Sequence, residues 1–218
     1  MGMYLLMRLM VLAVCFTEPV SARPIEDSLS SEGPTVLPDI VIADFEGEDY
    51  GDWEVSGQAF GSGPARGTLS GQMPVSGYKG KGLVNSFKGG DGTIGVLTSP
   101  AFKIERRYIN FLIGGGGFPG LTCINLLAEG RAVRTAVGPN TRLGGSEQLE
   151  WHTWDVSDLS GRTVRIQIVD QHTGGWGHIN IDHIVQSEST YQMVSDQRRT
   201  FEVRQHYLNF PVKNGAPK

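Results

Sequence analysis

The stretch between residues 170 and 184 carries the residue types best suited to chemistry in this 218-residue chain. It holds a glycine-rich turn, then Trp176 between two glycines, then an alternating run that predicts a β-strand. Ile179 and Ile181 occupy one face of that strand, and the other face holds His178, Asn180 and Asp182. The apolar face can pack a sheet, whereas imidazole, amide and carboxylate groups can hold a ligand or an ion.

Motifs of nucleophilic, zinc-dependent and phosphate-dependent catalysis do not occur in the sequence. It contains neither Gly-x-Ser-x-Gly nor His-Glu-x-x-His, and the glycine run 114–117 lacks the Lys-Ser/Thr ending of a phosphate loop. Paired carboxylates, which glycosidases use, occur as Asp44/Glu46, Glu48/Asp49 and Asp155/Asp158. We expect the second pair in solvent and the third in Asx-type turns. We therefore predict no catalytic residue in this chain.

Asp44 and Glu46 differ from the other acidic pairs because of the strand that they follow. The first and last strands of a jelly roll commonly lie side by side, which would bring Asp182 close to them. Carboxylate oxygens and backbone carbonyls are ligands of calcium. We therefore expect a structural calcium ion held by Asp44, Glu46 and Asp182; the alternative is that Asp182 caps a turn and Glu46 is exposed.

Four ring-bearing residues in or beside expected loops are candidates for contact with a sugar: Trp53, Tyr78, His172 and Trp176. Sugar rings stack on aromatic faces while neighbouring polar groups bind the hydroxyls. The glycines beside Trp176 allow either a close approach to a ligand or tight packing against the first strand. Tyr78, between Gly77 and Lys79, is expected to be exposed.

These side chains must be positioned by β-structure. The chain has 30 glycines, which lie between short apolar runs as turns do. Strands are expected at 40–45, 51–55, 82–87, 93–98, 108–113, 121–127, 131–137, 151–156, 163–169 and 178–185, and long loops at 57–80. No amphipathic helix is evident. The pattern predicts an all-β jelly roll or β-sandwich of about 8–10 short strands, like a carbohydrate-binding module.

The two ends of the chain differ from this middle part. Arg8, an apolar run and Val20-Ser21-Ala22 predict a signal peptide over 1–22, and hence a secreted, periplasmic or cell-surface protein. We expect a linker at 23–38, the β-sandwich module at 39–187, and the truncated start of a following domain at 188–218. Cys15 leaves with the signal peptide, and Cys123 is expected to be a buried, inert thiol.

Charge and hydropathy exclude some partners. The formal net charge of −4 argues against nucleic acid, whose phosphates favour basic proteins. Apart from the short run near the start, which is below the ~20 residues of a spanning helix, no apolar segment is long enough to cross a membrane.

Several blocks together carry a family resemblance: Asp-Phe-Glu-Gly (44–47), Tyr-Gly-Asp-Trp (50–53), Gly-Gln-Met-Pro-Val-Ser-Gly (71–77), Gly-Lys-Gly-Leu-Val-Asn-Ser-Phe (80–87), Asn-Phe-Leu-Ile-Gly-Gly-Gly (110–116) and the run 174–182. Over about residues 40–186 the chain resembles the N-terminal β-sandwich module of bacterial glycoside hydrolase family 32 proteins, the levanases and related β-fructosidases. Residues 206–216 resemble the segment that leads onward in those proteins. The resemblance implies an accessory module beside a fructan-hydrolysing domain.

The catalytic blocks of that family are missing from this chain. Trp-Met-Asn-Asp-Pro-Asn-Gly, Arg-Asp-Pro and Glu-Cys do not occur, so neither its nucleophile nor its general acid can be assigned here. We therefore expect a secreted, non-catalytic module that binds a polysaccharide or oligosaccharide, fructan first among them. Two alternatives remain open: a fragment of a glycosidase that hydrolyses β-fructosidic bonds, and a purely structural spacer.

Overall fold

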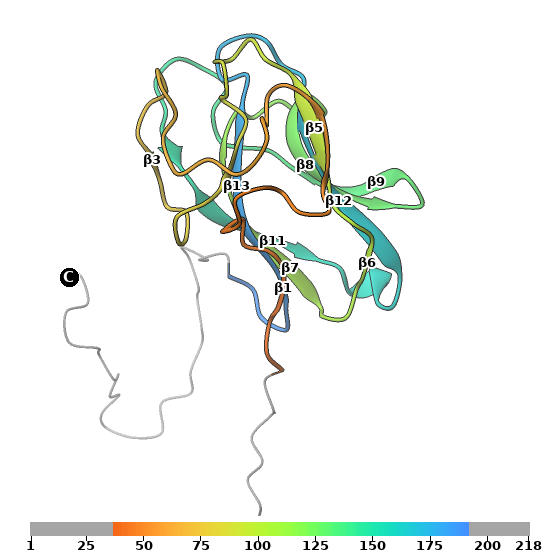
Figure 1. Ribbon diagram of the computed structural model, residues 1–218. Coiled ribbons are helices and arrows are strands. Elements are labelled where there is room, and N and C mark those ends of the chain that lie inside the picture. The colour runs from red at the N-terminus through yellow and green to blue at the C-terminus, as the bar shows by residue number, and fades with distance from the viewer. Residues whose placement is uncertain (1–36, 192–218) are drawn as a thin grey trace, which may run out of the picture. The chain divides into compact units, whose positions relative to one another are not determined.

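Alternating apolar residues in the longest strands build the core of the domain. In the computed structural model, which describes residues 37–191, β7 (Tyr108–Gly115) and β13 (Ile179–Ser187) pair antiparallel. Phe111 of β7 and Ile179 and Ile181 of β13 point inward and are buried in one large apolar cluster. The opposite sheet contributes its own inward residues, such as Ile166, to the same cluster. The domain is therefore a β-sandwich (Figure 1).

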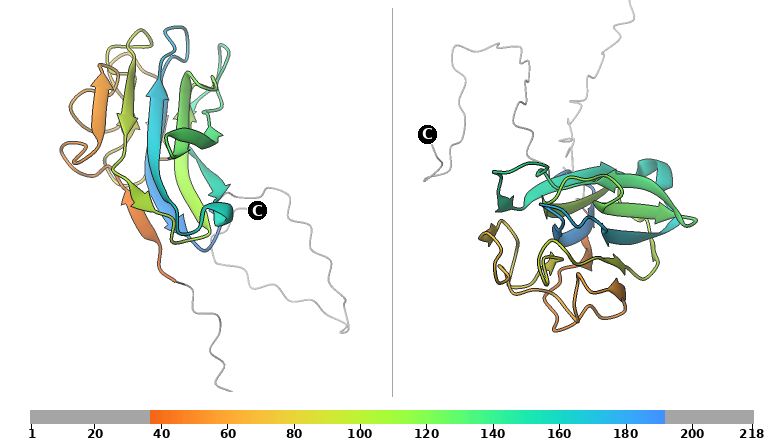
Figure 2. Two further views of the ribbon diagram at one scale, coloured as in Figure 1. Left: turned by 90° about the vertical axis from the view of Figure 1, so that its right-hand side faces the viewer. Right: turned by 90° about the horizontal axis from the view of Figure 1, so that it is seen from above.

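Two sheets face each other across this core. The first has the order β1-β13-β7-β11, with β4 also paired to β13, and the second has the order β2-β5-β12-β8-β9, with β6 paired to β12. The left view of Figure 2 looks onto the second sheet. The remaining strand bounds are β1 Ile40–Ala43, β2 Glu54–Gly57, β3 Val75–Ser76, β4 Val84–Asn85, β5 Gly95–Thr98, β6 Phe102–Lys103, β8 Thr122–Ala128, β9 Arg131–Ala136, β10 Glu147–Gln148, β11 Glu150–Asp155 and β12 Thr163–Asp170.

The sequence prediction of an all-β sandwich is confirmed. Within residues 37–191 the one helical element is a 3₁₀ turn, η1 (Ser157–Leu159), and no helix in that range is long and apolar enough to cross a bilayer. The predicted neighbourhood of the first and last strands is also confirmed, because β1 pairs with β13. Cys123 is buried as expected, and burial raises the pKa of its thiol.

Both faces of β7 and β13, the central strands of the first sheet, are covered. Leu112 of β7 points away from the main core and packs in a second, smaller cluster with Val75, Leu83 and Leu149. The loop-rich segment 57–80 supplies part of this cover, and β3 within it forms a parallel pair with β10. The side chains of His178 and Asn180 on this face are therefore buried.

Several sequence predictions fall outside the described residues. The signal peptide at 1–22, Cys15, most of the linker at 23–38 and most of the segment 188–218 lie there. The sheet elements run from Ile40 to Ser187, within the range predicted for the module.

Candidate functional site

A small pocket forms over the first residues of β13, on the outer side of the first sheet. Its volume is about 280 Å³, and the residues that matter for its chemistry are Gln72, Phe87, Asp91, Glu147, Trp176 and His178. We call it the His178 pocket. Its size is near the lower end of the ~300–1,000 Å³ usual for small-molecule sites, so it matches a single small ring better than a long polymer segment.

Local backbone geometry sets the position of Trp176. Its φ is +62°, in the left-handed region that non-glycine residues rarely adopt. Gly177 follows, and a Cβ there would lie 2.2 Å from the His172 carbonyl oxygen, so only glycine fits. The indole Nε1–H donates to the Arg142 carbonyl at 2.8 Å, which fixes the ring. A residue with a strained backbone and a fixed side chain is a feature of functional sites.

His178 lies between two carboxylates. Its Nδ1 is 2.6 Å from Asp91 Oδ1, and its Nε2 is 2.9 Å from Glu147 Oε1. An ionised carboxylate can only accept hydrogen bonds, so both ring nitrogens donate and the ring is an imidazolium. Burial by itself lowers the pKa of His178, but the hydrogen bonds and charges of Glu147 and Asp91 outweigh it and the pKa is raised.

Further buried polar groups surround the histidine. Asn180 Nδ2 donates to Glu147 Oε2 at 2.8 Å, while Asn180 Oδ1 is buried without a partner among the described residues. Asp170, at the end of β12, is fully buried, and neither of its oxygens has a well-formed hydrogen bond within residues 37–191. Burial raises the pKa of Asp170 to about 7, although the Ser86 hydroxyl and the charge of His178 act in the opposite direction.

Two aromatic rings border the imidazolium. The Trp176 ring lies 5.6 Å from that of His178 at an interplanar angle of 31°, and the Phe87 ring meets it edge-on at 4.9 Å. Both Trp176 and Phe87 are half-buried and line the pocket. The pocket therefore combines apolar ring surface with a charged, hydrogen-bonded floor.

The structure does not bring the four predicted sugar-contacting residues together. Trp176 lines the His178 pocket, whereas His172 stacks on Phe118 with ring centroids 4.0 Å apart and is not among the pocket residues. The expectation that Tyr78 is exposed is wrong: it is half-buried because it packs against the second apolar cluster. Contact of any of these residues with a sugar stays a prediction.

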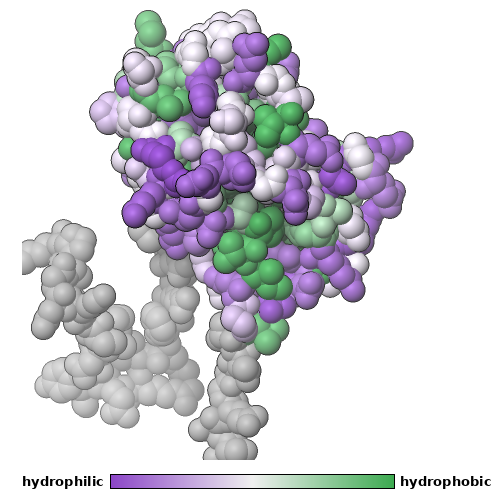
Figure 3. Space-filling view, in the orientation of Figure 1, coloured by the Kyte–Doolittle hydropathy of each residue, from purple (hydrophilic) through white to green (hydrophobic). Residues whose placement is uncertain are grey.

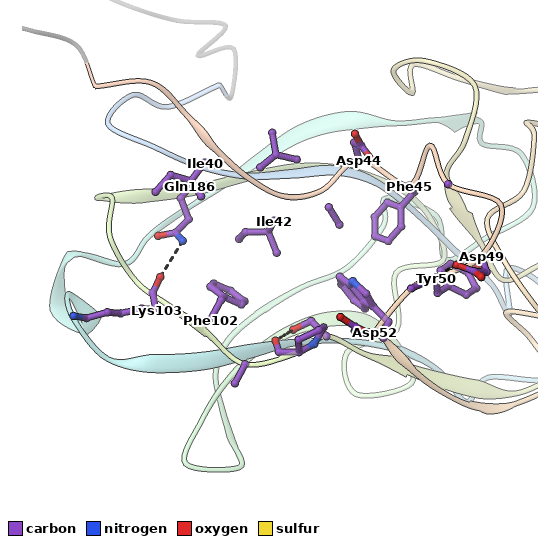
Figure 4. A pocket seen from close by; sticks show the side chains of 18 of the residues that line it. Ile40, Ile42, Asp44, Phe45, Asp49, Tyr50, Asp52, Phe102, Lys103 and Gln186 are labelled. Atoms are coloured by element: carbon purple, nitrogen blue, oxygen red, sulfur yellow. Dashed lines mark hydrogen bonds between the residues drawn. The ribbon is translucent and has the colours of Figure 1, made fainter.

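Trp53 lies in a different depression, at the open edge between the sheets. This edge groove has a volume of about 530 Å³ and is bordered by β1, β6 and the segment 44–53 (Figure 4). Ile42 and Phe102 face each other across it, and Gln186 Nε2 donates to the Lys103 carbonyl at 3.0 Å at one end. Apolar surface continues outward over β1, where Val41 is 55% exposed (Figure 3).

The three predicted calcium ligands lie near one another but are already bonded to backbone amides. Asp182 accepts the N–H groups of Lys79 and His183, each at 2.7 Å, and the Glu46 carboxylate accepts that of Gly82. Burial, together with the charges of Glu46 and Asp44, raises the pKa of Asp182 to about 7.

Within residues 37–191 no three or more His, Cys, Asp or Glu side chains form a group that could hold a metal ion. A calcium ion also takes backbone carbonyl oxygens as ligands, so calcium at Asp44, Glu46 and Asp182 stays a prediction.

Asp158 forms an ion pair with Arg134 instead of the expected Asx-type turn, and the other members of the acidic pairs lie as expected. Glu48 and Asp49 are exposed, and Asp155 accepts the Ser157 N–H at 3.0 Å in an Asx-type turn. Sequence reasoning missed Phe87, Asp91 and Glu147 of the His178 pocket. Asp91 and Glu147 are 87 and 31 positions from His178, so no spacing rule links them.

The comparisons with known proteins include a close relative. Over 148 residues the chain is 43% identical to ecdE, a protein of Aspergillus rugulosus whose name classes it provisionally as a glycosyl hydrolase. The match covers 66% of this chain and 20% of ecdE, so the chain spans about a fifth of the length of that relative. No family model matches the chain.

Solved structures with related architecture are distant. They include a cyclase from Fischerella sp. TAU (TM-score 0.42, 12% identity, 68% of this chain and 96% of that chain). The K1 adhesin domain of Lys-gingipain from Porphyromonas gingivalis W83 (0.42, 15%, 70% and 99%) and a family 35 carbohydrate binding module from Clostridium thermocellum (0.35, 13%, 68% and 97%) are others. These TM-scores are below 0.5, so the structures contribute nothing to the assignment of a function.

Proposed function

We propose that this chain is a secreted, non-catalytic β-sandwich module that binds carbohydrate, and that it serves a glycoside hydrolase polypeptide. The observation that carries the proposal is the His178 pocket, where Trp176 and Phe87 supply ring surface beside two fixed carboxylates. Sugar sites in proteins combine these two kinds of group. The name of ecdE, and the resemblance to family 32 modules, support the link to a hydrolase.

Binding suits this pocket better than turnover does. Both nitrogens of His178 are occupied by carboxylates, so the ring has no free nitrogen to take a proton from a substrate. Glu147 is only 3% exposed, and its two oxygens bond His178 and Asn180. We therefore assign these groups to recognition. Within the proposal, fructan is the polymer to test first because the resemblance points to levanases.

Isothermal titration of the full chain with levan, inulin and unrelated polysaccharides tests the binding. We expect heat of binding, and we expect Trp176→Ala to reduce affinity about tenfold or more in a folded protein, because one ring wall is lost. Tyr78→Ala removes a ring outside the pocket and should leave the affinity unchanged if the His178 pocket is the site. If Trp176→Ala leaves the affinity unchanged, or if no carbohydrate binds, the proposal fails and a structural spacer is the better description.

The alternative of a glycosidase fragment has a direct test. The purified chain is incubated with sucrose or levan, and released fructose is measured. We expect none, because the family's catalytic blocks do not occur in the sequence; release that survives further purification would favour the fragment.

Secretion is tested by N-terminal sequencing of protein from the culture medium, with a start near Arg23 as the expected result.

A further inference from the structure

The polar groups of the His178 pocket accept hydrogen bonds and have few donors left to offer. The two N–H groups of His178 are used on Asp91 and Glu147. The Gln72 amide is held by Asn85, to which it donates at 3.3 Å and from which it accepts at 2.8 Å. Asp91 is different, because its side chain is 32% exposed and reaches the pocket with a carboxylate. A ligand must therefore supply the donors.

The charge of the pocket is negative. Two carboxylates surround one imidazolium, which leaves one net negative charge, and no Lys or Arg occurs among the described residues that line the pocket. A ligand with a carboxylate or sulfate would be repelled, and a neutral sugar would leave the charge unbalanced. A ligand with a positive group would balance it.

The ring walls favour the same kind of ligand. A cation near the face of a tryptophan is attracted by the negative charge of the π-system, and Trp is the best of the aromatic residues in this respect. Trp176 is held in place by its bond to the Arg142 carbonyl and borders the same space as Asp91. An ammonium group in the pocket would meet both a carboxylate and an aromatic ring.

We propose that the His178 pocket binds a sugar unit that carries a free amine, with the protonated amine on Asp91 and the sugar ring against Trp176. This inference rests on the proposed carbohydrate function and goes beyond it, because fructans have no amine. The volume of about 280 Å³ limits the site to one such unit.

The test compares three trisaccharides on the full chain by isothermal titration near pH 6, where the amines are protonated. They are the glucosamine trimer, its N-acetylated counterpart, and a fructan trisaccharide. We expect the glucosamine trimer to bind about tenfold tighter than either of the others. We also expect its affinity to fall as salt rises from about 0.02 M to about 0.5 M, because a partly exposed charge pair is screened.

A matched pair of variants identifies the group responsible for the preference for the amine. Asp91→Asn keeps an oxygen that can accept from His178 but removes the negative charge, so the preference for the amine should fall toward onefold. Asp52→Asn, in the edge groove, makes the same chemical change elsewhere and should leave the preference intact. Circular dichroism confirms that both variants are folded.

The outcomes separate this inference from the proposed function. Equal affinity for all three trisaccharides, lost in Trp176→Ala, would overturn the amine preference while supporting carbohydrate binding. A preference for the amine that Asp91→Asn leaves unchanged would overturn the assignment to Asp91. Failure of all three trisaccharides and of the polysaccharides to bind would refute both.

Discussion

Asp170 provides the most quantitative prediction, because its carboxyl group is fully buried. Burial raises the pKa of Asp170 from 3.8 to about 7. Between these values the folded state keeps a proton that the unfolded state has released. The stability that this provides is fully present below pH 3.8 and is lost as the pH rises toward 7. The pKa difference corresponds to about 4 kcal/mol of unfolding free energy.

Asp170→Asn removes this titration, because an amide does not ionise. Between about pH 4 and pH 7.5, the free energy of unfolding of the natural chain should fall by about 4 kcal/mol more than that of the variant. The diagnostic quantity is the slope of the free energy of unfolding with pH. The unpaired N–H groups of the newly buried amide would lower the variant's free energy of unfolding by about 1–3 kcal/mol at every pH, which leaves that slope unchanged.

Urea unfolding, followed by tryptophan fluorescence at several pH values, measures this slope. The control is Asp52→Asn, the same substitution at an exposed carboxylate, which should leave the slope unchanged. Asp182 titrates in both proteins, so its contribution cancels in the comparison. Equal losses of stability in the natural chain and in Asp170→Asn would refute the reasoning.

Three further perturbations have defined outcomes. His178→Gln should cost about 3–5 kcal/mol in chemical denaturation, because it leaves buried Glu147 without its cation. Since the pKa of His178 is raised, this cost should be fully present below pH 6.5 and shrink as the pH rises; a pH-independent cost would contradict it. Gly177→Ala should lower the melting temperature clearly, whereas Gly175→Ala, which meets no neighbour, should change it little; equal effects would contradict the steric account. If calcium binds at Asp44, Glu46 and Asp182, a chelator should lower the melting temperature, and an unchanged midpoint would count against that site.

Strand periodicity made the central part of the site predictable. Because side chains alternate along a strand, the sequence assigns Ile179 and Ile181 to one face and His178 and Asn180 to the other, and the structure confirms that division. The same pattern predicts the sandwich, since each apolar run needs a second sheet to cover it.

The rest of the site depends on contacts that no local pattern encodes. Glu147 reaches His178 from a two-residue strand and Asp91 from a turn, and each would be read locally as a solvated acid. Sequence reasoning places Tyr78 wrongly for the same reason, because the second apolar cluster that Tyr78 packs against assembles from four separate segments. Tertiary packing, rather than propensity, decides these positions.

The small second cluster has a consequence for how the domain opens. Among the described residues, four buried side chains anchor the cover over the outer face of the first sheet, whereas the main core draws on both sheets. Regions with few buried apolar contacts unfold locally at lower free energy than the core. Amide hydrogens in the 57–80 segment, which includes β3, should therefore exchange with solvent before those of β7 and β13. Since Gln72 of this cover lines the His178 pocket, a bound ligand would slow that exchange.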